Sequence, residues 1–123
     1  MRLSRAFWLW APVVAWAAVI FALSSVADLG TGLGAWDTIL RKCAHASEYA
    51  VLALLLYRAI GRELPAFLIG FAYAVTDELH QAFVRGRHAS PFDVSMDAAG
   101  LAVGLLLLHV ARWRWASVQS QRG

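Results

Sequence analysis

The stretch Ala66–Gln81, with the sequence AFLIGFAYAVTDELHQ, is apolar over most of its length and polar near its end. Its first eleven residues, through Thr76, are almost wholly apolar. Four polar residues then arrive nearly together: Asp77, Glu78, His80 and Gln81. A run of this hydropathy, continuing to Val84, is long enough to span a bilayer as a helix. The pattern therefore predicts a transmembrane helix that is apolar in one half and polar at the other end.

The composition of the whole chain also indicates a membrane protein. Its 123 residues are 60% hydrophobic and 15% charged, against about 45–50% and about 25% in ordinary soluble domains. A chain this short cannot bury so much apolar surface in one core, and a bilayer accepts the excess. The same composition excludes a disordered chain, a coiled coil and a disulfide scaffold. We expect a single transmembrane domain over residues 1–123.

Apolar runs on both sides of this stretch predict an all-α polytopic membrane protein with a bundle of four transmembrane helices. The expected helices cover about residues 6–24, 42–60, 65–84 and 92–111. Residues 25–27 resemble a signal-peptide cleavage site. The first run is nevertheless long enough to span the membrane, so a retained helix is favoured. Closely spaced glycines predict a loop over residues 26–40, and the tail to Gly123 is expected to fray.

The basic residues set the expected orientation. The net charge is +3, but the eleven Lys and Arg residues are scattered between apolar runs, which argues against a nucleic-acid partner. With four alternating helices, one side carries seven of them: Arg2, Arg5, Arg58, Arg62, Arg112, Arg114 and Arg122. The other side carries four: Arg41, Lys42, Arg85 and Arg87. The positive-inside rule then places both termini in the cytoplasm.

In this topology the unusual polar residues collect toward the outer side of the membrane. They are Lys42, His45, Glu48, Asp77, Glu78, His80, Gln81, Asp93 and Asp97. Each ionisable group costs about 2.5–3.5 kcal/mol at the bilayer centre, so such groups usually face the protein interior and pair. A network that only stabilises the helices is one interpretation. Because apolar replacement of a buried ion pair is often neutral or stabilising, a functional site is favoured.

Three segments resemble motifs of VanZ-like membrane proteins. They are RKCAHASEY at residues 41–49, DELHQAF at residues 77–83 and GRHASPFDV at residues 86–94, the last continuing through Gly100 and Gly104. Residues 23–25 resemble the end of that family's first helix. Asp97 departs from the family pattern, since many members have Asn there. The resemblance implies a multi-pass protein of the bacterial inner membrane, in a family named after a member that lowers susceptibility to the lipoglycopeptide teicoplanin.

The first functional hypothesis is a site for an anionic amphiphile at the outer leaflet, such as lipid-linked cell-wall material or a lipoglycopeptide, beside membrane lipids. Lys42 and Arg87 would hold a phosphate or carboxylate headgroup, and Asp93 and Asp97 would orient these cations. Two pairs could serve as acid and base: His45 with Glu48, and Asp77 with His80. The remaining candidate ligand-binding residues are Tyr49, Glu78 and Gln81. Whether the protein is an enzyme stays open.

Two further hypotheses belong to other classes. His45-x-x-Glu48 and Asp77-x-x-His80 each place two metal-ligand types on one helix face, but the adjacent Arg41 and Lys42 would repel a cation, so no metal or other cofactor is expected. A non-enzymatic structural or partner-binding component is the second. Gly100 and Gly104 could then form a dimer interface, although packing within the chain is favoured.

Overall fold

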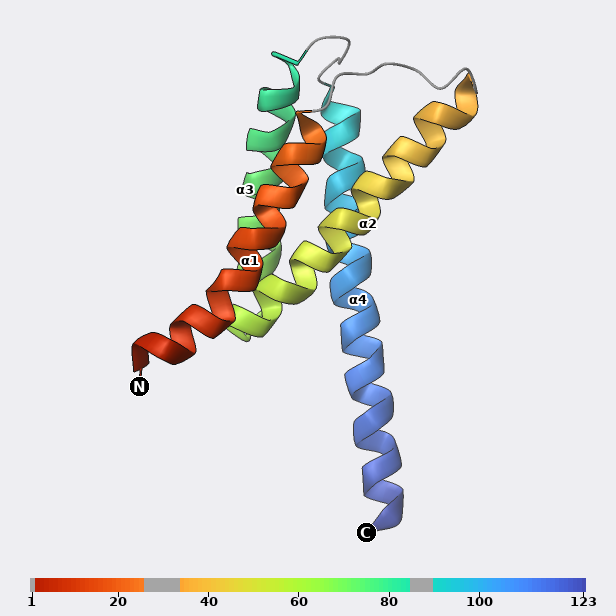
Figure 1. The fold of residues 1–123 in the computed structure, drawn as a ribbon. Coiled ribbons are helices and arrows are strands. Elements are labelled where there is room, and N and C mark those ends of the chain that lie inside the picture. Colours follow the sequence, from red (N-terminus) through yellow and green to blue (C-terminus); the bar gives the residue numbers. More distant parts are fainter. Residues whose placement is uncertain (1, 26–33, 85–89) are drawn as a thin grey trace.

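The computed structural model describes residues 2–25, 34–84 and 90–123, with the exception of the side chains of Arg2 and Thr38. These residues form four helices, which are α1 (Arg2–Ser24), α2 (Ala35–Ile60), α3 (Glu63–Gln81) and α4 (Pro91–Arg122). The all-helical expectation is confirmed. Successive helices run in alternating directions, and both termini lie at the end opposite Ser24 and the start of α4 (Figure 1).

Two helix boundaries differ from the sequence-based expectation. The loop expected through residue 40 is wrong beyond Gly34, because α2 begins at Ala35. After Gly34 no glycine occurs before Gly61, and Asp37 in the first turn stabilises the helix start. The expected frayed tail is also wrong, because α4 continues to Arg122. Residues 105–122 contain neither glycine nor proline, so nothing in this segment interrupts the helix.

The helices do not stand side by side over their full lengths. Helix α2 runs obliquely across the others, and the C-terminal half of α4 extends away from them (Figure 1). The most extensive packing joins α2 to α4, while α1 packs on α2 and only slightly on α3. Hydrogen bonds that attach α1 include one from the Trp16 indole to the Glu48 carbonyl at 2.8 Å and one from the Tyr73 hydroxyl to the Ala17 carbonyl. The packed core runs along the helices and includes Ile20, Leu56, Ala66 and Leu101.

Small residues allow α2 and α4 to approach closely. A Cβ atom on Gly100 would overlap the Ala46 carbonyl oxygen and lie 2.9 Å from the Ala46 Cα. A Cβ atom on Gly104 would lie 2.6 Å from the Ala50 carbonyl oxygen. Both glycines are buried, so α2 of the same chain covers the face that the sequence offered for either internal packing or dimerisation.

Helix ends are placed by local sequence. Gly61 ends α2 in the left-handed conformation, with φ of 80°, and its N–H donates to the Tyr57 carbonyl at 2.7 Å. Ser90 caps α4 by accepting a hydrogen bond from the Asp93 N–H at 3.2 Å, and Pro91 follows as the first helical residue. The Ser90 cap fixes Asp93 at the end of the molecule where the other polar residues collect.

Two of the helices meet the length and hydropathy of a membrane span. They are Leu3–Ser24 in α1 and Pro91–Arg122 in α4. Much of their apolar surface is not covered by the rest of the chain; Trp8, Val14, Leu106 and Leu107, for example, are all exposed. Large apolar surfaces of this kind are unusual on soluble monomers, and they agree with the compartment expected from composition.

Candidate functional site

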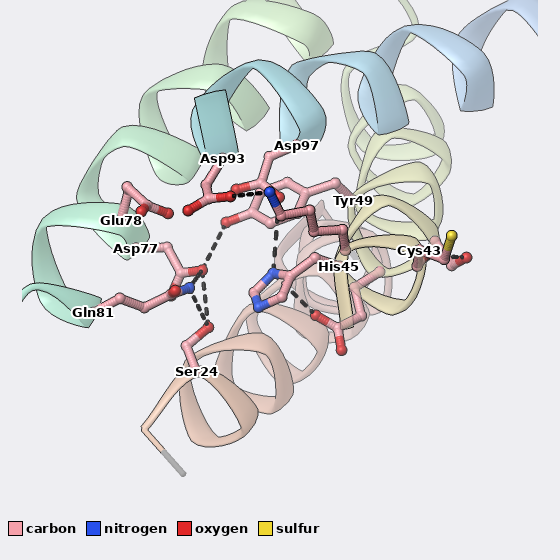
Figure 2. Close-up of polar contacts among 12 residues, drawn as sticks. Ser24, Cys43, His45, Tyr49, Asp77, Glu78, Gln81, Asp93 and Asp97 are labelled. Carbon is pink, nitrogen blue, oxygen red and sulfur yellow. Dashed lines mark hydrogen bonds and ion pairs between the residues drawn. The ribbon is translucent and has the colours of Figure 1, made fainter. Parts of the chain in front are cut away.

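Asp77 is the centre of a buried hydrogen-bond cluster that joins three helices (Figure 2). Its Oδ2 accepts hydrogen bonds from the Ser24 hydroxyl at 2.9 Å, the Tyr49 hydroxyl at 3.1 Å and the Gln81 amide at 3.3 Å. Gln81 also donates to the Ser24 Oγ at 3.3 Å. Only 2% of Asp77 is exposed, and Ser24 and Tyr49 are fully buried. Neighbours on α1, α2 and α3 therefore hold this carboxylate in place.

His45 connects α2 to α4 beside this cluster. Its Nδ1 lies 3.7 Å from Glu48 Oε2 on the same helix and 3.7 Å from Asp97 Oδ1 on α4. The ring is nearly parallel to that of Tyr49, with centroids 6.5 Å apart. Asp97 is 2% exposed. The expected His45–Glu48 proximity is confirmed, and Asp97 is an additional neighbour that helical spacing does not indicate.

Lys42 and Asp93 lie at the edge of the same cluster. The Lys42 Nζ is 3.4 Å from Asp93 Oδ1 and 4.2 Å from the centre of the Phe92 ring, with a third of the lysine side chain exposed. The Ser90 hydroxyl donates to Asp93 Oδ2 at 3.0 Å, and the Ser90 N–H donates to Glu78 Oε1 at 2.9 Å. The expected orientation of Lys42 by a carboxylate is present, and Glu78 contacts the residue that caps α4.

The second expected acid–base pair does not form. His80 Nε2 lies 2.9 Å from the Ser25 Oγ, and its ring stacks on Phe21 with centroids 4.2 Å apart. His80 and Asp77 both belong to the described part of the chain, and within that part no ion pair joins them. Asp77 faces the interior, while His80, three residues later, lies on the flank against α1. Arg87, expected to hold a headgroup, lies outside the described residues.

Sequence reasoning missed the contribution of the first helix to this site. Ser24 contacts Asp77 directly and Ser25 contacts His80. The available signal was a pair of hydroxyl residues ending an otherwise apolar run, at the same end of the molecule as the ionisable residues. Because serine is common at the end of a membrane span, the sequence alone does not mark Ser24 and Ser25 as site residues. Their role follows only from the position of α1 against α3.

Residues 4–112 match the model of the VanZ/LLP1 family, which includes every residue of the cluster just described. The chain belongs to the VanZ/LLP1 family. Comparison with curated proteins and with solved structures found no significant match. The resemblance drawn from the three motifs is confirmed. VanZ/LLP1 membership, together with the two apolar helices, supports a membrane protein.

Proposed function

We propose that this VanZ/LLP1 protein crosses the bacterial inner membrane four times and binds an anionic amphiphile of the cell envelope at its outer-leaflet side. The ligand class is lipid-linked cell-wall material or a lipoglycopeptide such as teicoplanin, which would connect the protein to glycopeptide susceptibility. Lys42 would contact the anionic headgroup, and the apolar helix surfaces would contact the acyl chain and the membrane lipids. Both termini would then lie in the cytoplasm.

The exposed surfaces of α2 and α3 support the two additional spans. Helix α3 presents apolar side chains outward at Leu64, Leu68, Ile69, Phe71 and Val75. Its 19 residues extend about 28 Å, close to the roughly 30 Å hydrocarbon thickness. In α2 no charged residue lies between Ala50 and Tyr57. This apolar segment exposes Val51 and Leu54. Half of the charged residues of these two helices, namely Lys42, Glu48, Asp77 and Glu78, belong to the site.

The observation that carries the ligand proposal is the setting of Lys42. Asp93 and Phe92 contact its ammonium group on one side. Because the side chain is partly exposed, the remaining N–H donors of the ammonium group are accessible to a ligand. An ammonium held in this way loses little freedom when it binds a phosphate or carboxylate, and a charge-assisted hydrogen bond is among the stronger polar contacts. The position at the rim of the cluster suits a headgroup that arrives from the membrane interface.

The buried half of the cluster favours a second role, which is purely structural. Asp77 receives three hydrogen bonds from three different helices, so this part of the site stabilises the fold whatever the rim binds. A non-enzymatic stabilising network is the alternative to ligand binding, and variants of Lys42 separate the two.

Replacing Lys42 with glutamine should weaken binding of teicoplanin to the purified full-length protein in nanodiscs at least tenfold. The lost charge-assisted contact is worth about 1.5–3 kcal/mol, and about 1.4 kcal/mol corresponds to a factor of ten. Lys42→Arg should retain binding, and Arg114→Gln, which removes an exposed cation from the far part of α4, should change nothing. Equal affinity of Lys42→Gln and the unchanged protein, at equal folded fraction, would refute the proposal.

Cys43 tests the proposed orientation. It is exposed in the first half of α2, next to Lys42, and the sequence contains no other cysteine. A membrane-impermeant maleimide should label it in intact spheroplasts. A Cys43→Ser, Gln121→Cys variant should react only in inside-out vesicles. The reverse pattern in the two proteins would overturn the orientation.

A further inference from the structure

Three side chains from three helices form a group with the composition of a metal site. A ring nitrogen of His45 on α2, a carboxylate oxygen of Asp77 on α3 and one of Asp97 on α4 all lie within 4.8 Å of one another. His45 Nδ1 lies 3.7 Å from Asp97 Oδ1. Ligand atoms bound tetrahedrally about 2.0–2.1 Å from a zinc ion are roughly 3.3 Å apart. A small inward movement of the three side chains would therefore bring their ligand atoms to the spacing found around zinc.

Asp77 supplies an independent observation. Its Oδ2 carries all three hydrogen bonds from Ser24, Tyr49 and Gln81. Its Oδ1 is buried and has no hydrogen-bond partner among the described residues. A buried carboxylate oxygen without a donor is costly, and a bound cation removes that cost. A cation bound by Oδ1, with Oδ2 held by surrounding hydrogen bonds, would match the usual arrangement of a carboxylate ligand.

The surrounding charges favour a cation. Glu48 lies beside the group, with its Oε2 3.7 Å from His45 Nδ1, in addition to the group's own two carboxylates. The cation nearest to it in sequence, Lys42, is directed to Asp93 and Phe92 at the rim. The repulsion expected from the sequence between Lys42 and a metal is therefore reduced by the neighbouring Asp93 carboxylate.

We infer that His45, Asp77 and Asp97 together bind one divalent transition-metal ion, of which Zn²⁺ is the best fit. Imidazole nitrogen and carboxylate oxygen are both zinc ligands, and three protein ligands leave a coordination position for water or an anionic oxygen. This ligand set differs from the two i, i+3 pairs expected from the sequence. His80 does not belong to it, because its ring contacts Ser25 and Phe21 instead. The metal site does not depend on which amphiphile binds at Lys42.

The experiment uses the full-length protein purified in detergent, stripped with a chelator, and titrated with Co²⁺ and then Zn²⁺. We expect one Co²⁺ per chain, with a visible absorption band, and its displacement by Zn²⁺ in a one-to-one ratio. A band that never develops, or metal that is lost on gel filtration from the unchanged protein, would overturn the inference without recourse to any variant.

Variants locate the site. Asp97→Asn should weaken zinc binding at least tenfold, and Asp97→His, which restores a ligand atom, should recover much of it. The matched control is His109→Gln, which removes the exposed His109–Glu63 pair, where Nδ1 lies 3.2 Å from Oε1. Metal binding that survives Asp97→Asn unchanged, or that is lost equally in His109→Gln, would assign the metal to another place. Circular dichroism would check that each variant retains its helices, and Asp97→His decides the question if Asp97→Asn does not fold.

Discussion

Replacement of Gly100 by alanine is expected to destabilise the protein by about 1–3 kcal/mol, the usual cost of overpacking a tightly packed contact. The added Cβ atom would overlap the Ala46 carbonyl oxygen. That oxygen belongs to the backbone of α2 and cannot turn away, so α2 and α4 must separate. Their separation would also loosen the contact between His45 and Asp97. The measurement is the thermal unfolding midpoint in detergent, followed by intrinsic tryptophan fluorescence.

The control for Gly100 is Ala102→Leu, which adds a larger side chain at an exposed position two residues away on the same helix. It should leave the midpoint nearly unchanged. If the glycines served mainly to join two copies of the chain, Gly100→Ala would change the oligomeric state and its effect would depend on protein concentration. An unchanged midpoint in Gly100→Ala would contradict the close contact between α2 and α4.

Replacement of Asp77 by leucine should produce the second large effect. The substitution removes the acceptor of three hydrogen bonds and leaves the buried hydroxyls of Ser24 and Tyr49 without it. Each unsatisfied buried group costs about 1–3 kcal/mol. We expect a markedly lower thermal midpoint or failure to accumulate in the membrane, measured with a chelator present so that metal binding does not contribute. Thr76→Ala, which removes an exposed hydroxyl that donates to the Tyr73 carbonyl of its own helix, should have little effect.

A double-mutant cycle separates the hydrogen bond from general damage. In the unchanged protein, Tyr49→Phe should destabilise, because the phenol donates to Asp77 at 3.1 Å. In the Asp77→Leu background, the same change should be neutral or stabilising, since it removes an unsatisfied buried hydroxyl. Equal destabilisation in both backgrounds would show that Tyr49 and Asp77 do not interact.

The polar end of the molecule was predictable because its signals are local. Hydropathy identifies each apolar run, and the order of apolar and charged residues within a run places Asp77 and Glu78 at one end of a helix. Alternation of direction then brings the start of α2, the end of α3 and the start of α4 together. The extents of α2 and α4 were less predictable, because polar and aromatic flanks such as Trp36 and Trp113 are compatible with either helix or loop.

By itself, the sequence determined the helical class, the apolar surfaces, the motifs of the VanZ/LLP1 family and the gathering of ionisable residues at one end. Only the tertiary structure decided their partners: Asp77 meets Ser24 and Tyr49, His45 meets Asp97, and His80 turns to Ser25. The physical reason is that helical spacing fixes which residues share a face of one helix. The rotation and crossing of neighbouring helices fix which residues that face meets, and for α2 and α4 they are set by the close approach at Gly100 and Gly104.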